Sequence, residues 1–125
     1  MQPTKVLAVD DSKLMLKMYE VMLRSVPVVL ASNGREALEL LHRHADIDLV
    51  LLDINMPVMN GYDVLSQIRS QGLLDRVTVI VVTTEGEDDD IRRGLESGAT
   101  AYLTKPFQAD QVQRVIQGVR RGGVR

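Results

Sequence analysis

The sequence contains no cysteine, which excludes disulfide bonds, thiol catalysis and thiolate metal sites. It also lacks any stretch that approaches the roughly 20 apolar residues needed to span a bilayer, and residues 1–5 lack the basic and apolar regions of a signal peptide. Neither sign of charge dominates, because 15 Lys and Arg side chains oppose 17 Asp and Glu side chains. We therefore expect a cytoplasmic protein that binds neither nucleic acid directly nor a membrane.

The length of 125 residues is that of one domain, long enough to bury a core without disulfides or structural metals. No internal repeat, linker or low-complexity segment divides the chain. We expect a single domain over residues 1–125, in which residues 121–125 form a frayed tail. Because the chain begins at Met1 and ends without a linker, we expect a stand-alone protein rather than an excised domain.

Five short apolar runs alternate with helix-length segments. The runs are continuously apolar, which is typical of strands that are buried on both faces of a sheet. They cover residues 6–9, 28–30, 47–52, 77–82 and 101–103. Five strands that alternate with five helices predict an α/β fold with a doubly wound parallel sheet, whose ligands bind beyond the carboxyl ends of the strands.

The first helix-length segment has an apolar face that we assign to the core. Its members recur at helical spacing: Met15, Met18, Tyr19 and Met22. Leu14 and Leu16 lie off this face, so we expect them to be exposed. They form a candidate docking patch for an upstream protein, and scattered surface leucines are an equally good interpretation.

Two local signals mark helix boundaries. Asn33, with Glu36 three residues later, predicts a capped start for the second helix, and Gly98 predicts a left-handed stop for the fourth. The dense run of acids over residues 85–90 is typical of a solvated helix start.

Polar side chains follow four of the five apolar runs. Asp10 and Asp11 follow the first run, Asp53 the third, Thr83 the fourth and Lys105 the fifth. Carboxyl ends of parallel strands meet at one edge of a sheet, so these groups are expected to converge there. Zinc is disfavoured, because thiolates and clustered imidazoles are missing.

Oxygen-rich side chains at one edge predict a site for a hard divalent cation such as Mg²⁺. The charges of Asp10, Asp11 and Asp53 would be balanced by Mg²⁺ together with Lys105. An incoming phosphoryl group then becomes tolerable, and an aspartate among such groups can act as a nucleophile that forms an aspartyl phosphate.

These residues, together with their neighbours, resemble the receiver domain of bacterial response regulators of two-component signalling systems. The resemblance covers the chain nearly end to end. It is carried by Asp10-Asp11-Ser12, the segment D-I-N-M-P-V-M-N-G at residues 53–61, Thr83, and Y-L-T-K-P-F at residues 102–107. It implies the flavodoxin-like strand order 2-1-3-4-5.

The resemblance also implies roles at the acidic edge. Asp53 would be the phosphoryl acceptor in a Mg²⁺-dependent reaction. Asp11 and Asp53 would be direct metal ligands, Asn55 a ligand through its backbone carbonyl, and Asp10 a ligand through water.

A switching mechanism is implied at the other two strand ends. Lys105, followed by a cis bond to Pro106, would bind a phosphoryl oxygen. Thr83 would hydrogen-bond the new phosphate while Tyr102 changes rotamer, a local charge event that biases a two-state surface. That surface spans residues 88–119, and its candidate contacts with an unknown downstream protein are Ile91, Leu95, Tyr102 and Gln111.

The resemblance therefore predicts a phosphorylation switch, not an enzyme, that receives its phosphoryl group from a histidine kinase or phosphotransfer protein. The first alternative is a Mg²⁺-dependent phosphohydrolase. Such enzymes commonly carry a second acid two residues after the nucleophile, where this chain has Asn55. The second alternative, a binding scaffold that never takes phosphate, would normally lack one of the acids or the lysine.

Overall fold

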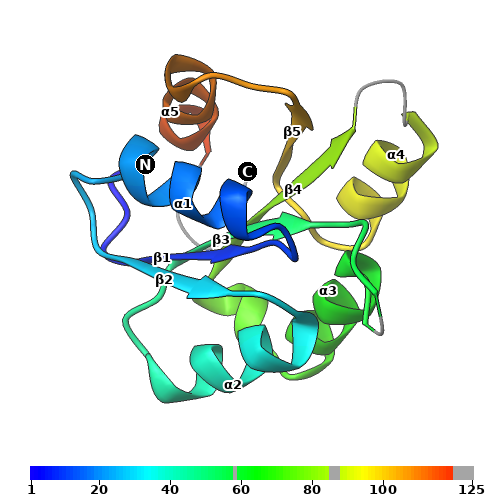
Figure 1. Ribbon diagram of the computed structural model, residues 1–125. Coiled ribbons are helices and arrows are strands. Elements are labelled where there is room, and N and C mark those ends of the chain that lie inside the picture. Colours follow the sequence, from blue (N-terminus) through cyan, green and yellow to red (C-terminus); the bar gives the residue numbers. More distant parts are fainter. Residues whose placement is uncertain (58, 85–87, 120–125) are drawn as a thin grey trace.

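A parallel sheet of five strands forms the centre of the computed structural model (Figure 1). The structure describes residues 1–57, 59–84 and 88–119. The strands are β1 (Val6–Val9), β2 (Val28–Ala31), β3 (Leu49–Asp53), β4 (Thr78–Thr84) and β5 (Ala101–Lys105). Their order in the sheet is β2-β1-β3-β4-β5, and every neighbouring pair is parallel. The predicted fold class and strand order are confirmed.

Helices cover both faces of the sheet. They are α1 (Lys13–Met22), α2 (Gly34–Arg43), α3 (Gly61–Ser70), α4 (Asp88–Glu96) and α5 (Ala109–Gly118), with a short 3-10 helix η1 (Leu73–Asp75). In Figure 1, α1 and α5 lie above the sheet, and α2 and α3 lie below it. Each face has its own apolar cluster, so the strands are buried on both sides as their continuous apolarity predicts. None of the helices in the described part of the chain is long and apolar enough to cross a membrane.

Two strands continue further than their apolar runs. β4 includes Thr83 and Thr84, and β5 includes Thr104 and Lys105, because the pairing continues through Thr83 opposite Thr104 and Thr84 opposite Lys105. The ladder is formed by backbone groups, so polar side chains do not end it. Thr83 and Lys105 therefore project from regular strand backbone. The predicted tail at residues 121–125, and Glu85 and Glu87 of the acidic run, lie outside the described residues.

The core face of α1 includes Tyr19, with Met15 and Met22 partly buried against the same cluster, as predicted, but it differs from the prediction at Leu16 and Met18. Leu16 and Tyr19 are the buried residues of the helix, and Leu23 follows at its C-cap with no exposure, whereas Met18 is 37% exposed. The prediction that Leu16 is exposed is therefore wrong, while Leu14, at 70%, is exposed as expected. The buried Tyr19 ring lies 6.0 Å from the Phe107 ring, and both belong to the apolar cluster that contains Leu16 and Leu23.

The predicted boundaries of α2 and α4 agree with the structure. The Asn33 side chain accepts a hydrogen bond from the Glu36 N–H at 2.9 Å, although the Glu36 carboxylate accepts from Ser32 N–H rather than from Asn33. Gly98 follows α4 with φ +120°, a conformation that side chains with a Cβ rarely adopt. Gly94, inside α4, lies against β4, where a Cβ would come within 3.1 Å of Val81.

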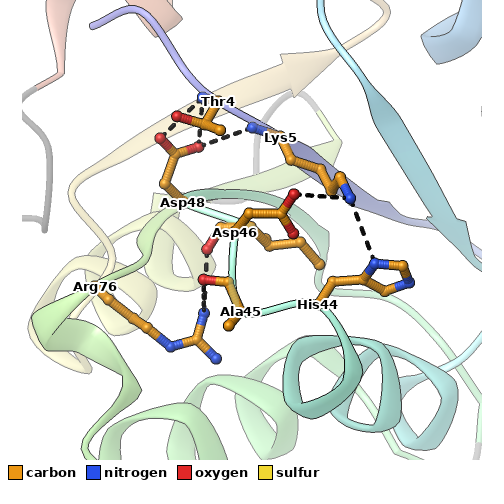
Figure 2. A network of polar contacts seen from close by, with 8 residues as sticks. Thr4, Lys5, His44, Ala45, Asp46, Asp48 and Arg76 are labelled. Carbon is orange, nitrogen blue, oxygen red and sulfur yellow. Dashed lines mark hydrogen bonds and ion pairs between the residues drawn. The ribbon is translucent and has the colours of Figure 1, made fainter.

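A polar network joins segments at the amino end of the sheet (Figure 2). The buried Asp48 carboxylate accepts hydrogen bonds from Thr4 N–H at 3.0 and 2.9 Å and from Lys5 N–H at 3.3 Å. The Lys5 ammonium pairs with Asp46 at 2.9 Å and lies 3.4 Å from Nδ1 of His44. These contacts join the entry to β1 with the segment between α2 and β3.

Arg76 completes this network (Figure 2). Its guanidinium donates to the backbone carbonyl oxygens of Leu41, Ala45 and Ile47 at 2.8 to 3.2 Å. These carbonyls lie at and beyond the end of α2, where backbone acceptors lack intrahelical partners. The entry to β4 is thereby joined to the end of α2.

Candidate functional site

Three carboxylates meet at the opposite, carboxyl end of the sheet. Asp10 follows β1 and Asp53 ends β3, and the register of Val9 with Leu52 places these two strand ends side by side. With Asp11, they offer carboxylate oxygens that all lie within 4.8 Å of one another. Asp10 and Asp53 are buried and Asp11 is exposed. An all-oxygen donor set of this kind fits a hard divalent cation that retains water ligands on its open side.

Lys105 lies within the same site. Its ammonium is 2.7 Å from Oδ2 of Asp10 and 3.7 Å from Oδ1 of Asp53. The Lys105–Pro106 peptide bond is cis, as expected. The structure thus brings together every charged residue that the sequence assigned to the site, and the lysine pairs more closely with Asp10 than with Asp53.

One backbone donor and one side-chain donor hold the Asp10 carboxylate. Its Oδ1 accepts the Ser12 N–H at 2.9 Å, while Oδ2 accepts the Lys105 ammonium. Ser12 is also the N-cap of α1, where its hydroxyl accepts the Met15 N–H at 3.2 Å. The start of α1 and the acidic site are therefore built by the same three residues, 10–12.

Asp53 is less well compensated than Asp10. Its Oδ1 accepts the Asn55 N–H at 3.3 Å, a long hydrogen bond. Burial, followed by the charge of Asp10, raises the pKa of Asp53 to about 6, although Lys105 and the Asn55 N–H act in the opposite direction. The negative charge on Asp53 is thus costly in the protein alone, and any cation that enters the site relieves that cost.

Gly61 allows the loop after Asp53 to close over the strand end. A Cβ at this position would lie 2.5 Å from the carbonyl oxygen of Asp53, so no other residue fits without backbone movement. The Gly61 N–H donates to the Ile54 carbonyl at 2.9 Å. The adjoining N-cap, Asn60, forms a reciprocal capping box with Asp63. In the sequence, Gly61 is distinguished only as part of the motif at residues 53–61, and no local pattern signals this close approach.

Thr83 has a buried hydroxyl at the edge of this site. The residue is 1% exposed, and within the described part of the chain its Oγ1 has no hydrogen-bond partner. β4 lies beside β3, with Asp53 opposite Val82 in the register, so Thr83 is one residue further toward the carboxyl edge. A buried hydroxyl without a partner costs on the order of 1–3 kcal/mol, which a ligand with acceptor oxygens would recover.

The remaining predicted residues lie at the periphery. Asn55 is exposed in the loop after β3. Tyr102 is 45% exposed on β5. It lines a groove between α4, β5 and α5 with Leu95, Gln111 and Arg114, and is not part of the carboxylate cluster.

The helical spacing predicts only a core position for Tyr19, but its hydroxyl also interacts electrostatically with the acids of the site. Its hydroxyl is buried and has no hydrogen-bond partner among the residues that the structure describes. Burial, and then the charges of Asp10 and Asp53, raise the pKa of Tyr19. The only signal in the sequence was a polar atom on an aromatic residue at a core position.

Comparison with known families shows which family the chain belongs to. The model of the response regulator receiver domain matches residues 6–117. The chain belongs to this family. Receiver domains are signalling switches of two-component systems, not classical enzymes.

Individual relatives agree with this assignment. The receiver is 40% identical to the probable transcriptional regulator ycf27 of Guillardia theta over 94% of the chain, and spans 45% of that protein. It is 33% identical to the chemotaxis protein CheY1 of Helicobacter pylori, covering 92% of this chain and 95% of the relative. The solved structure of Vibrio cholerae chemotaxis protein CheY4 superposes with a TM-score of 0.85 at 33% identity, over 93% of this chain and 98% of that one. The match therefore includes both a whole relative and a part of a longer one.

Proposed function

We propose that Asp53 accepts a phosphoryl group from a histidine kinase or phosphotransfer protein, in a Mg²⁺-dependent reaction, and that the modification alters the α4–β5–α5 surface to control a partner protein. The observation that carries this proposal is the buried Asp53 carboxylate, which lies beside two further acids and 3.7 Å from the Lys105 ammonium. The cytoplasmic location expected from the sequence belongs to the same proposal.

The chemistry is an in-line displacement at phosphorus. An Asp53 carboxylate oxygen forms the new P–O bond while the P–N bond of a donor phosphohistidine breaks, and the electron pair returns to the leaving imidazole. Asp53 acts in its deprotonated form, which its raised pKa of about 6 disfavours at acidic pH in the protein alone. Lys105 provides an ammonium for a phosphoryl oxygen.

The acids would also hold the metal. We assign Asp10, Asp11 and Asp53 as its carboxylate ligands or water-mediated ligands, and the backbone carbonyl of Asn55 as a further one. When bound, Mg²⁺ supplies positive charge that offsets the acids and the incoming phosphoryl oxygens. The Asn55 N–H, which already donates to Asp53, keeps that loop against the carboxylate.

Thr83 and Tyr102 are proposed to transmit the change. The Thr83 hydroxyl is available to donate to a phosphoryl oxygen. β4 pairs with β5 through Val81 and Tyr102, so a movement at the end of β4 lies next to the groove that Tyr102 lines. Ile91, Leu95 and Gln111 of the flanking helices complete the proposed contact surface.

The upstream protein is proposed to dock on α1. Leu14 is 70% exposed, Met18 37% and Val21 68%, and their spacing places them on one side of the helix. α1 begins directly after Asp10-Asp11-Ser12, so a protein bound there stands beside the acceptor. Leu16, which the sequence assigned to this patch, is buried and is not part of it.

Incubation with a small phosphodonor and Mg²⁺ tests the proposal. Intact-mass measurement should show one added phosphoryl group, and peptide mapping should place it on Asp53. Asp53→Asn should take up none, whereas Asp46→Asn, an exposed acid at the other end of the sheet, should label as the wild type does. Steady release of phosphate from external phosphoesters would instead support a phosphohydrolase, and no labelling of the wild type would support the scaffold alternative.

A further inference from the structure

Tyr62 connects the start of α3 to the start of α4. It is the second residue of α3 and is 9% exposed. Its hydroxyl lies 2.6 Å from Oδ1 of Asp90 and 2.9 Å from the Asp90 backbone oxygen, and it donates to both acceptors. The Arg93 guanidinium lies over the same ring, with Cζ 4.0 Å from the ring centroid. We call these three residues the Tyr62 clasp.

The α3 side of the clasp is adjacent to the acceptor strand. The preceding residue, Gly61, packs against the Asp53 carbonyl and donates its N–H to Ile54. No flexible segment separates this contact from Tyr62, because both residues belong to the first turn of α3. The tyrosine backbone is therefore held relative to the phosphoryl acceptor.

The α4 side of the clasp lies in the first turn of that helix. Asp90 belongs to the first turn, whose other acids, Asp88 and Asp89, are exposed. The close packing of α4 on the sheet is at Gly94 against Val81, one turn further along. Within the described residues, Tyr62 thus provides the polar contact that holds the beginning of α4.

A purely apolar role for Tyr62 does not account for this arrangement. A tyrosine on the core face of a helix needs only one partner for its hydroxyl. Here the hydroxyl meets a charged carboxylate, and a second charged residue from the same helix stacks on the ring. Hydrogen bonds to a charged acceptor are shorter and stronger than neutral ones, so the contact favours one position of α4.

We propose that Tyr62 is a positioning residue whose hydroxyl holds the first turn of α4 to the start of α3, which packs against the strand end that carries the phosphoryl acceptor, so that α4 responds to events at Asp53. The dependence on phosphorylation rests on the proposed function, whereas the positioning of α4 does not. The clasp adds a further connection to the proposed switch of Thr83 and Tyr102, because it joins the end of β3 to α4 through the start of α3.

Amide hydrogen exchange of Tyr62→Phe tests the clasp, because this variant retains the ring and its contact with Arg93. Without phosphodonor, exchange of residues 88–92 should accelerate about fivefold, the effect of one lost hydrogen bond on local opening. Residues 34–43 of α2 should be unchanged. The control Gln71→Ala removes the hydrogen bond of 2.7 Å between His42 and Gln71, which joins the α3 end to α2, and should leave residues 88–92 as in the wild type.

The second part of the experiment adds phosphodonor and Mg²⁺. Tyr62→Phe should label on Asp53 as fully as the wild type. The difference in exchange at residues 88–92 between its labelled and unlabelled forms should, however, be less than half of the difference that the wild type shows. In a double-mutant cycle, Asp90→Ala should add little to Tyr62→Phe.

The outcomes separate this proposal from the proposed function. Failure of the wild type to label contradicts the proposed function, and the comparison without phosphodonor still tests the positioning of α4. Unchanged exchange at residues 88–92 in Tyr62→Phe overturns the clasp. A faster-exchanging α4 that responds to labelling as strongly as the wild type overturns its coupling to Asp53.

Discussion

Both ends of the sheet bury aspartate side chains, but Asp48 at the amino end and Asp53 at the carboxyl end differ in how well their charge is compensated. At the amino end, Asp48 is 5% exposed and accepts backbone N–H groups from Thr4 and Lys5 through both of its oxygens. At the carboxyl end, Asp53 is 3% exposed, accepts one long hydrogen bond from Asn55 and faces the acidic Asp10. Similar burial therefore leaves the charge of Asp48 well compensated and the charge of Asp53 poorly compensated.

This difference in compensation indicates which buried acid has a structural role and which is a candidate for function. Asp48 receives its compensation from donors that are part of the fold, so its charge contributes to the joining of β1 and β3. Asp53 lacks such compensation and depends on Lys105 and on groups that come from outside the chain. A buried charge that the fold leaves poorly compensated is a candidate for function, because its free-energy cost is recovered only when a ligand binds.

The largest expected effect is at the structural end. Asp48→Ala removes the acceptor of the Thr4 and Lys5 N–H groups and should lower the free energy of unfolding by about 3 kcal/mol, since two part-buried backbone donors lose their acceptor. Urea unfolding followed by circular dichroism measures this loss. Asp46→Ala, which removes the exposed partner of Lys5, should cost much less, because solvent screens an exposed ion pair. Equal costs for the two variants would contradict the assignment of a structural role to Asp48.

A smaller effect of opposite sign is expected at the functional end. Asp53→Asn should stabilise the metal-free protein by about 2 kcal/mol above pH 6, because it removes a carboxylate whose pKa is raised from 3.8 to about 6. The folded state of the wild type binds this proton more tightly than the unfolded state does. The penalty is therefore absent below about pH 3.8 and grows as the pH rises to 6.

Urea unfolding of wild type and Asp53→Asn across this pH range measures the difference. Addition of Mg²⁺ at pH 7.5 serves as the control, because it should stabilise the wild type and leave the variant nearly unchanged. A difference between the two proteins that does not vary with pH would show that the Asp53 charge is not the cause.

The contrast between the ends was only partly predictable from the sequence. The sheet and the meeting of Asp10, Asp53 and Lys105 follow from apolar runs that end in polar residues, since parallel strands deliver their carboxyl ends to one edge. The closer pairing of Lys105 with Asp10 than with Asp53 was not predictable, because it depends on side-chain positions within the site.

Other features depend on contacts between segments that no local pattern connects. Asp48 meets Thr4 across 44 positions, and Tyr62 meets Asp90 across 28. The error at Leu16 has a different origin. α1 is apolar around most of its circumference, so spacing alone could not decide which stripe faces the sheet, and Tyr19 is common to the predicted and the observed face.

Tyr19 gives the smallest expected effect and tests how far the poorly compensated region extends. Its hydroxyl is buried without a partner in the described chain, and the charges of Asp10 and Asp53 raise its pKa after burial does. Tyr19→Phe removes that hydroxyl and keeps the ring against Phe107, so the free energy of unfolding should rise by about 1 kcal/mol. Thermal and urea unfolding at pH 7.5 measure the change. A loss of stability instead would mean that the hydroxyl is hydrogen-bonded through water. The buried polar groups at the carboxyl end would then be better satisfied than we infer, and the contrast with Asp48 would be weaker.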